Sequence, residues 1–431
     1  MRPFIVIALV LDLLLFFLVV VYELFVSLEL NAVSLVFLGV LILFAAFCVV
    51  SLRLLRTRRP WVVRTWTVVL SMTFAYWILD LAAGVLLIQS PWLIRDDVVH
   101  HRLPRSAVLR VSSREYWTSV TTDRWGLRGD EISLAKDSDQ YRIVMLGDSF
   151  TMGKGVEDDE TFAALLDERL SQTSPLGVEV INAGVDSYTP LLSYLYLRYQ
   201  LADLDPDLVV LNLDMSDLIQ DRAYRALAVR DESGEIVAVP APPPPDWFPV
   251  GPLVQRWTRD HLFLGRMVMY QLGPESARDG GLVEGTVELA NPELLAHTLQ
   301  GDEVDRSGQW GALFESIGMV KAFCDARGMQ FLLTVYPWGH QVDDEEWVPG
   351  RNVFLPVDAR TSDNSVRIIE ERADAAGITL LNVIPQFRAR RREGPIYFDH
   401  DMHWRPVGHR IMADALEPHL RDQILGSVEA R

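Results

Sequence analysis

Two short stretches of the sequence carry residue types that together could perform acyl transfer. The first is Gly147-Asp148-Ser149, which follows a short apolar run. The second lies far down the chain and contains Asp401-Met-His403. A serine hydroxyl is a weak nucleophile until a base removes its proton, and the base needs a carboxylate to orient it. Ser149 as the nucleophile, His403 as the base and Asp401 as the orienting acid would fill the three roles.

The segments around these stretches predict an open α/β sheet. Apolar runs rich in β-branched residues predict five strands, and segments with a helical pattern separate them. Such alternation is typical of a doubly wound, mostly parallel sheet with helices on both faces, a three-layer α/β/α fold. In open sheets of this kind ligands bind at the carboxyl ends of the strands, where Ser149 stands. The predicted strands are residues 142–146, 178–184, 207–213, 330–336 and 378–383, and the predicted helices are residues 159–170, 190–204, 310–327, 362–376 and 405–420.

A strand-end Gly-Asp-Ser149, followed late in the chain by Asp401-x-His403 ahead of a final helix, resembles the SGNH (GDSL) hydrolase superfamily. The resemblance covers roughly residues 115–425 and is to membrane-anchored bacterial members in particular. It implies an SGNH or flavodoxin-like fold, serine ester hydrolysis, and neither a metal nor a cofactor. It also implies that Asp148 is structural and does not belong to the triad.

The resemblance further implies an oxyanion hole. Its donors would be the backbone N–H groups of Ser149 and of Gly184, which ends an Asn-Ala-Gly turn. The third donor in the family is an asparagine side chain, and this chain has Ser216 at that position. A hydroxyl has a shorter reach than an amide, and losing one oxyanion donor costs about 10²–10³ in rate. Ser216, a water or another residue substitutes, or catalysis is slow.

The histidine-rich loop leaves alternatives open. Asp399 and His400 could supply the acid or the base, although Trp404 and the later Gly-His pair match the family pattern best with Asp401 and His403. A zinc site is the second interpretation, because histidine and aspartate are zinc ligands, but the spacing fits no common zinc motif. Its candidate ligands are His400, Asp401, His403 and His409, with His340.

Composition and local sequence argue against several other classes. The 431-residue chain has a net charge of −18, and residues 1–90 hold six arginines and four acids, so the rest is strongly acidic. An acidic surface argues against nucleic acid as a partner. Met152 and Gly155 replace the glycine and the serine or threonine of a phosphate-binding loop, which excludes nucleotide binding there. The two cysteines, Cys48 and Cys324, give no disulfide framework.

Three apolar stretches predict a membrane anchor at residues 1–90. Each is about as long as the ~20 residues that span a bilayer. The loop at residues 53–64 carries five arginines, so it and the amino terminus are expected in the cytoplasm, and residues beyond 90 in the periplasm or outside the cell. Asp12 and Asp80 fall within the spans and are interpreted as helix–helix hydrogen-bonding groups, with a transport or relay role as the alternative. The spans are residues 3–22, 30–52 and 65–88.

The remainder divides into a neck at residues 91–140 and a hydrolase-like domain at residues 141–425, with an insertion at about 221–306. The insertion contains a polyproline piece and is interpreted either as a lid or as a passive surface excursion. Arg128, in the neck, has two interpretations: substrate binding or a structural salt bridge.

An acyl-transfer site outside the membrane would meet glycans, which carry ester-linked acyl groups, commonly acetyl. Tyr188, Trp338 and Trp404 are predicted to stack on sugar rings, with core packing as the alternative. By resemblance, the expected function is an esterase that deacylates cell-surface carbohydrate. A polysaccharide O-acyltransferase would use the same triad, and phospholipid or lipoprotein esters are further substrates. The competing class is a weak or inactive SGNH-fold module that binds glycan or an envelope assembly partner, which Ser216 favours and the intact triad opposes.

Overall fold

The computed structural model of the chain describes residues 92–113, 115–241, 293–302 and 304–430, with six single positions between 61 and 76. The predicted three-span anchor and most of the predicted insertion lie outside the described residues. Within the described ranges, no helix is both long and apolar enough to cross a bilayer. The chain divides into two compact units, Met1–Ile88 with Pro244–Gly281, and Gln89–Pro243 with Leu282–Arg431, and the second holds the candidate site.

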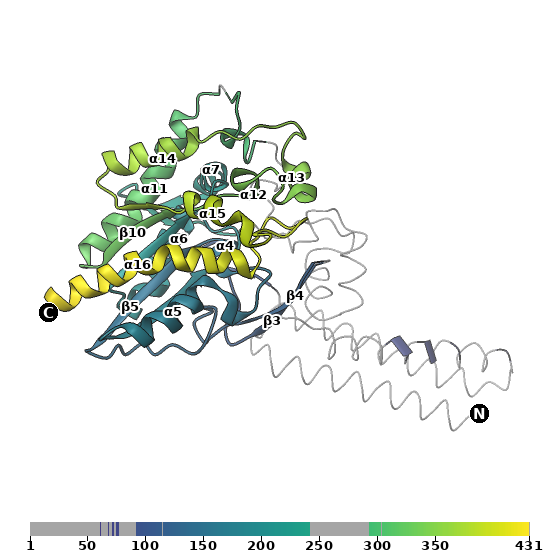
Figure 1. Cartoon of the computed structure of the whole chain (residues 1–431). Helices are drawn as coiled ribbons and strands as arrows, with labels where there is room; N and C mark the ends of the chain where they lie inside the picture. The colour runs from purple at the N-terminus through teal and green to yellow at the C-terminus, as the bar shows by residue number, and fades with distance from the viewer. Residues whose placement is uncertain are drawn as a thin grey trace. The chain divides into compact units, whose positions relative to one another are not determined.

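A five-stranded parallel sheet forms the centre of this second unit (Figure 1). The order of its strands is β11-β10-β7-β5-β6, and every neighbouring pair is parallel. β7 and nearly all of β5 are buried, which explains their continuous apolar runs. The predicted five-stranded parallel sheet is confirmed. The strands are β5 (Gln140–Gly147), β6 (Gly177–Gly184), β7 (Leu208–Leu213), β10 (Gln330–Val335) and β11 (Leu380–Asn382).

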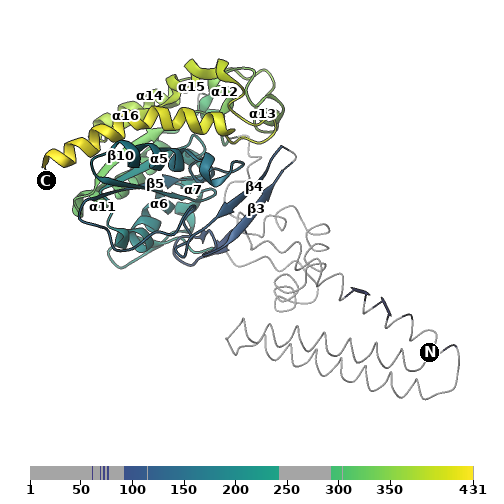
Figure 2. The same ribbon diagram turned by 60° about the horizontal axis from the view of Figure 1, so that its bottom comes forward.

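Helices cover both faces of the sheet (Figure 2). α5 packs against α16 on one face, and α6, α7 and α11 pack together on the other. α5 begins after Thr161, whose side chain caps the N–H of Ala164, and the acidic residues before it form a separate 3₁₀ turn. The α-helices are α4 (Ser149–Met152), α5 (Phe162–Thr173), α6 (Pro190–Tyr196), α7 (Asp217–Leu227), α11 (Ser307–Ala326), α12 (Gly339–Val342), α13 (Val348–Phe354), α14 (Asn364–Ala375), α15 (Ile384–Arg390) and α16 (Pro406–Ala430), and the short turns are η1 (Asp158–Glu160), η2 (Leu197–Leu201), η3 (Ala202–Leu204), η4 (Ala296–Thr298) and η5 (Arg391–Glu393).

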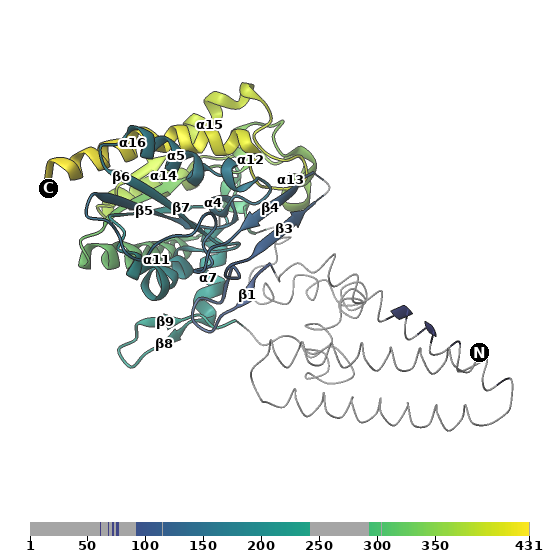
Figure 3. The same cartoon turned by 90° about the horizontal axis from the view of Figure 1, so that it is seen from below.

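Among the described residues, three two-stranded hairpins accompany the sheet, and Figure 3 shows β3 and β4 beside it. Two of them come from the segment interpreted as a neck, which lies in the same compact unit as the sheet. The third follows α7, and a bridge between Val99 and Val239 ties it back to the neck. The hairpin strands are β1 (Ile94–Arg95), β2 (His101–Arg102), β3 (Val108–Ser112), β4 (Trp117–Thr121), β8 (Val229–Arg230) and β9 (Ile236–Ala238).

Candidate active site

The structure brings Ser149, His403 and Asp401 into contact. Ser149 Oγ lies 2.6 Å from His403 Nε2, and His403 Nδ1 contacts Asp401 Oδ1. Ser149 is 7% exposed and His403 4% exposed, so little water surrounds the pair. A serine bonded to a histidine that a carboxylate orients is the arrangement that activates a serine for acyl transfer.

The turn after β5 delivers the serine. Gly147 has a φ of +151°, and an added Cβ would lie 2.3 Å from Thr151 Oγ1, so no other residue fits there without strain. Asp148 then caps α4: its Oδ1 accepts the N–H of Phe150 at 2.9 Å and the hydroxyl of Tyr336 at 2.7 Å. Asp148 therefore fixes the turn that presents Ser149.

Gly184 lies where the end of β6 packs directly on α4. A Cβ at Gly184 would be 2.2 Å from Met152 N, so only glycine permits this approach. The Gly184 N–H donates to Asn182 Oδ1 at 3.1 Å. In this structure the predicted oxyanion donor is thus engaged by a neighbouring side chain.

Ser216 does not serve as the third oxyanion donor in this structure, contrary to the prediction. Its side chain is buried, and its hydroxyl donates to Asp214 Oδ2 at 2.5 Å. A hydroxyl has a single proton, so Ser216 cannot at the same time donate to a substrate oxygen. The N–H of Ser149 stays a predicted oxyanion donor.

The three aromatic residues predicted to stack on sugar rings are buried, so that interpretation is wrong. The hydroxyl of Tyr188 donates to the carbonyl of His101 at 2.6 Å, and the indole N–H of Trp338 donates to Asp214. The ring of Trp404 packs edge-on against Phe150. All three rings lie in the core and are not open to a sugar ring.

The zinc interpretation requires several ligands close together, and the part of the chain that the structure describes contains no such cluster. There, no three histidine, cysteine, aspartate or glutamate side chains are grouped to hold a metal ion. His409 Nδ1 accepts the N–H of Phe162 at 3.2 Å, where it caps the start of α5. His340 Nε2 lies 2.8 Å from Thr298 Oγ1.

Electrostatics keep Asp401 ionised. Burial alone would raise its pKa, but the charge of His403 and hydrogen bonds from His403 and Tyr116 outweigh burial and lower the pKa. Lys154 adds to this effect and also pairs with Asp186 at 2.9 Å. Asp186 is likewise held ionised: burial opposes it, but the charges of Lys154 and His403 lower its pKa to about 2.

Two buried carboxyl groups, Asp148 and Asp214, lie next to the nucleophile turn. Burial raises the pKa of each, and the charge of Asp214 raises the pKa of Asp148 further. Both carboxyl groups therefore bind a proton more readily than an exposed aspartate does.

Arg128 makes a structural salt bridge, which was one of its two interpretations, and it holds the segment that follows Ser149. Its buried guanidinium donates to the carbonyls of Met152 at 2.8 Å, Gly153 at 2.6 Å and Val156 at 2.7 Å, and pairs with Asp158 at 2.8 Å. The short Gly-Leu-Arg sequence gave a signal for this residue. No sequence pattern indicated Lys154 and Asp186, because only the fold brings them beside the triad.

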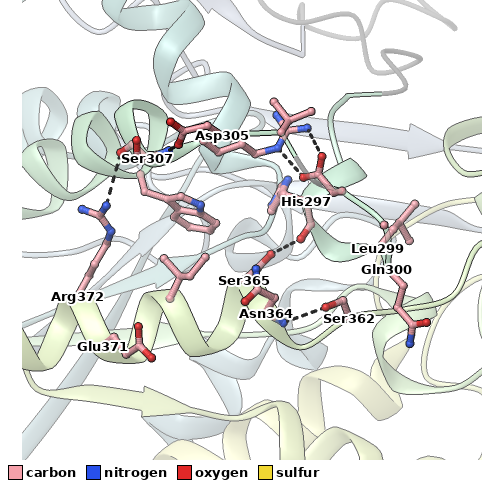
Figure 4. A pocket seen from close by; sticks show the side chains of 16 residues that line it. His297, Leu299, Gln300, Asp305, Ser307, Ser362, Asn364, Ser365, Glu371 and Arg372 are labelled. Atoms are coloured by element: carbon pink, nitrogen blue, oxygen red, sulfur yellow. Dashed lines mark hydrogen bonds and ion pairs between the residues drawn. The ribbon is translucent and has the colours of Figure 1, made fainter.

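A cavity of about 450 Å³ lies at the amino ends of α11 and α14 (Figure 4). None of the triad residues lines it. Arg306, the buried cation in its wall, pairs with Asp302 at 2.7 Å, and Ser365 donates to the carbonyl of His297. This cavity is therefore separate from the candidate triad.

Comparison with known proteins gives one family match. Residues 302–431 match the family described as SGNH hydrolase-like domain, acetyltransferase AlgX. That range contains Asp401 and His403 but not Ser149, so the match concerns the carboxyl-terminal part of the domain. A comparison with curated proteins finds no match.

Several solved structures are distantly similar. A variant of Axe2, an acetyl-xylooligosaccharide esterase from Geobacillus, is 13% identical with a TM-score of 0.35, over 66% of this chain and 94% of that one. The acetyl xylan esterase AlAXEase is 15% identical with a TM-score of 0.34, over 64% and 97%. LAE5, an α/β hydrolase from the metagenome of Lake Arreo, Spain, is 14% identical with a TM-score of 0.33, over 66% and 95%. The assignment of the fold depends on the order and direction of the strands in the sheet.

Proposed function

We propose that the protein is a serine acyl esterase or acyltransferase that acts on ester-linked acyl groups, such as acetyl, of cell-surface carbohydrate. The observation that carries the proposal is the 2.6 Å contact between Ser149 Oγ and His403 Nε2, with Asp401 behind the imidazole. The match of residues 302–431 to the family described as SGNH hydrolase-like domain, acetyltransferase AlgX, supports acetyl as the transferred group.

The reaction follows from the geometry. Ser149 Oγ attacks the acyl carbonyl as His403 Nε2 takes its proton, and His403 then gives that proton to the departing sugar oxygen. The acyl group is left on Ser149 as an ester. Water, or a hydroxyl of a second sugar, loses its proton to His403 and attacks this ester. His403 then returns the proton to Ser149 Oγ as the ester bond breaks, which restores the free serine. Water as the acceptor makes the protein an esterase, and a sugar makes it an O-acyltransferase.

A weak or inactive SGNH-type module that binds glycan or an envelope partner is the second candidate. One observation favours it: the Gly184 N–H and the Ser216 hydroxyl, both expected in the oxyanion hole, are bonded to Asn182 and Asp214. Losing one such donor costs about 10²–10³ in rate. A low turnover with intact triad geometry is compatible with both candidates, so activity must be measured directly.

The three apolar stretches of residues 1–90 support a location for this function. They would tether the domain to a membrane with the amino terminus in the cytoplasm and the site in the periplasm or outside the cell. A reporter enzyme that is active only outside the cytoplasm, fused after residue 90, tests the orientation. An inactive reporter there would contradict it.

The test of activity uses the full chain in detergent, with acetylated xylo-oligosaccharides and a short aryl acetate as substrates. Released acetate measures hydrolysis, and acetyl groups that appear on an added unacetylated oligosaccharide measure transfer. We expect one or both from the wild type and neither from Ser149→Ala or His403→Ala. Folded wild-type protein that releases no acetate and transfers none would favour the binding module.

A further inference from the structure

The turn between β3 and β4 reaches the candidate catalytic acid from outside the sheet. The hydroxyl of Tyr116 donates to Asp401 Oδ2 at 2.7 Å, while His403 lies against Oδ1. Both carboxylate oxygens are therefore held, one by the base that Asp401 orients and one by a phenol. Burial and the charge of Asp401 raise the pKa of Tyr116, so the phenol keeps its proton and remains a donor.

Glu115, the preceding residue, holds the loop that carries Asp401. Its carboxylate accepts the backbone N–H of Asp399 at 2.7 Å, of His400 at 2.9 Å and of Asp401 at 2.9 Å. These residues belong to no helix or strand, so Glu115 supplies the acceptors that regular structure would otherwise supply. Hydrogen bonds to an ionised acceptor are about twice as strong as neutral ones.

The hairpin is also fixed to the segment that follows Ser149. The N–H of Ser119 donates to Glu157 at 3.0 Å, and the N–H of Thr121 donates to Asp158 at 3.0 Å. The hairpin thus bridges two parts of the site that lie 254 positions apart in the chain, the serine turn and the histidine loop.

The turn has its own internal bonds that set the two side chains. Ser113 Oγ accepts the N–H of Glu115 at 3.0 Å and of Tyr116 at 3.3 Å. The ring of Tyr116 packs at 4.9 Å from that of Phe398, just before the loop it supports. A turn with this local support can hold its contacts with Asp401 at a small entropic cost.

We propose that Tyr116 and Glu115 are positioning residues of the acyl-transfer site, which hold Asp401 and its loop so that His403 stays aligned with Ser149. The inference rests on the proposed function and adds to it two residues outside the Gly-Asp-Ser and Asp-x-His stretches. The neck then forms part of the machinery of the site, beyond any role as a linker.

Other charged groups face the same pair and must be kept unchanged in a test. Lys154 lowers the pKa of Asp401, and the charge of His403 in turn lowers the pKa of Asp186, which lies on another segment. Arg405 lies 3.9 Å from Glu115 and 3.3 Å from Asp399. Tyr116→Phe alters none of these charges and keeps the ring, so it isolates the hydroxyl.

Without the Tyr116 hydroxyl, the Asp401 carboxylate has one hydrogen-bond donor fewer, and its negative charge interacts more strongly with His403. We expect a Tyr116→Phe rate about tenfold below wild type, the usual size of a hydrogen bond to a charged group. The acidic limb of the pH–rate profile should shift to higher pH by about half a unit. Asp401, without the hydrogen bond from Tyr116, stabilises the protonated imidazole of His403 more strongly. A purely structural role would change the amount of folded protein and leave the limb in place.

The rate of fluorophosphonate labelling of the full chain in detergent, from pH 5 to pH 9, measures both effects. Tyr199→Phe, at a tyrosine that is 46% exposed, is the matched control and should behave as wild type. A Tyr116→Phe rate within twofold of wild type with an unmoved limb overturns the inference alone. Wild-type protein that does not label at Ser149 overturns the proposed function and the inference with it.

Hydrogen exchange gives a readout that does not depend on activity. Glu115→Ala should raise amide exchange in the peptide that contains residues 399–401, whereas Glu232→Ala, at an exposed glutamate of another turn, should not. Glu115→Gln keeps an acceptor oxygen without the charge, so its labelling rate should lie between those of wild type and Glu115→Ala. Unchanged exchange in Glu115→Ala overturns the assignment of Glu115.

Discussion

The contact between the end of β6 and α4 makes Gly184 a position where one added methyl group should displace the nucleophile. A Cβ at Gly184 would lie 2.2 Å from Met152 N and 2.7 Å from Met152 Cα. Relaxed non-bonded contacts are about 3.5–4 Å, so the strand and the helix must separate by about 1 Å. Both sides of the contact are backbone, and no side-chain rotation can relieve it.

The displacement should act on stability and on rate in different proportions. Overpacking of this kind costs about 1–3 kcal/mol, which a domain of this size tolerates. Ser149 is the first residue of α4, so a shift of the helix moves Oγ away from His403 Nε2. A misplacement of about 1 Å typically costs around 10²-fold in rate. We therefore expect Gly184→Ala to fold and to lose about 100-fold in ester hydrolysis.

Gly177→Ala is the matched control, at the other end of the same strand. Its nearest neighbour would be the Asp139 carbonyl oxygen at 4.0 Å, and neither glycine has a positive φ. Aryl acetate hydrolysis and thermal melting of both variants measure rate and stability. Gly177→Ala should stay within twofold of wild type. Equal rates for the two variants would show that β6 does not position Ser149 through α4.

Three further predictions concern other residues of the site. Ser216→Ala should lower ester hydrolysis by less than about threefold, because its hydroxyl is bonded to Asp214, and a loss of about 10²–10³ would restore it as an oxyanion donor. Arg128→Met should lower the free energy of unfolding, measured by urea denaturation, by about 3–5 kcal/mol, since it removes a buried cation from Asp158 and from three carbonyls; a change below about 1 kcal/mol would contradict its structural role. Burial, with the nearby charge of Arg128, lowers the pKa of His409 to about 3. Below about pH 6.5 the unfolded chain therefore binds a proton that the folded state excludes, so the free energy of unfolding decreases as the pH is lowered. His409→Gln should therefore reduce the loss of unfolding free energy between pH 7 and pH 5 by roughly 2 kcal/mol, and an unchanged loss would contradict this assignment.

The sheet and the triad could both be predicted from the sequence, and for the same reason. Strands buried on both faces leave continuous apolar runs, as in β7, and a parallel sheet gathers their carboxyl ends at one edge. Ser149 stands at such an end, and Asp401 and His403 precede the last helix. The chemistry of the three side chains then left few arrangements that could work.

The direction in which a single loop side chain points could not be predicted from the sequence. Trp338 and Trp404 follow strand-like segments, and an aromatic residue in a loop has no periodicity to tell an outward ring from an inward one. Both are buried in the structure. Ser216 has the same problem, because nothing in its sequence context shows that Asp214 takes its hydroxyl. The contacts of Tyr116 and Glu115 join segments far apart in sequence, which no local pattern records.

The most direct test of the central claim, that Ser149 is the nucleophile of an acyl-transfer site, is to locate the covalent adduct. The full chain in detergent is treated with a fluorophosphonate, digested and analysed by mass spectrometry. We expect one principal adduct on the peptide that contains Ser149, and we expect it to form much more slowly in His403→Ala. Folded wild-type protein without an adduct at Ser149, or an adduct that forms equally fast in His403→Ala, would show that Ser149 is not the activated nucleophile.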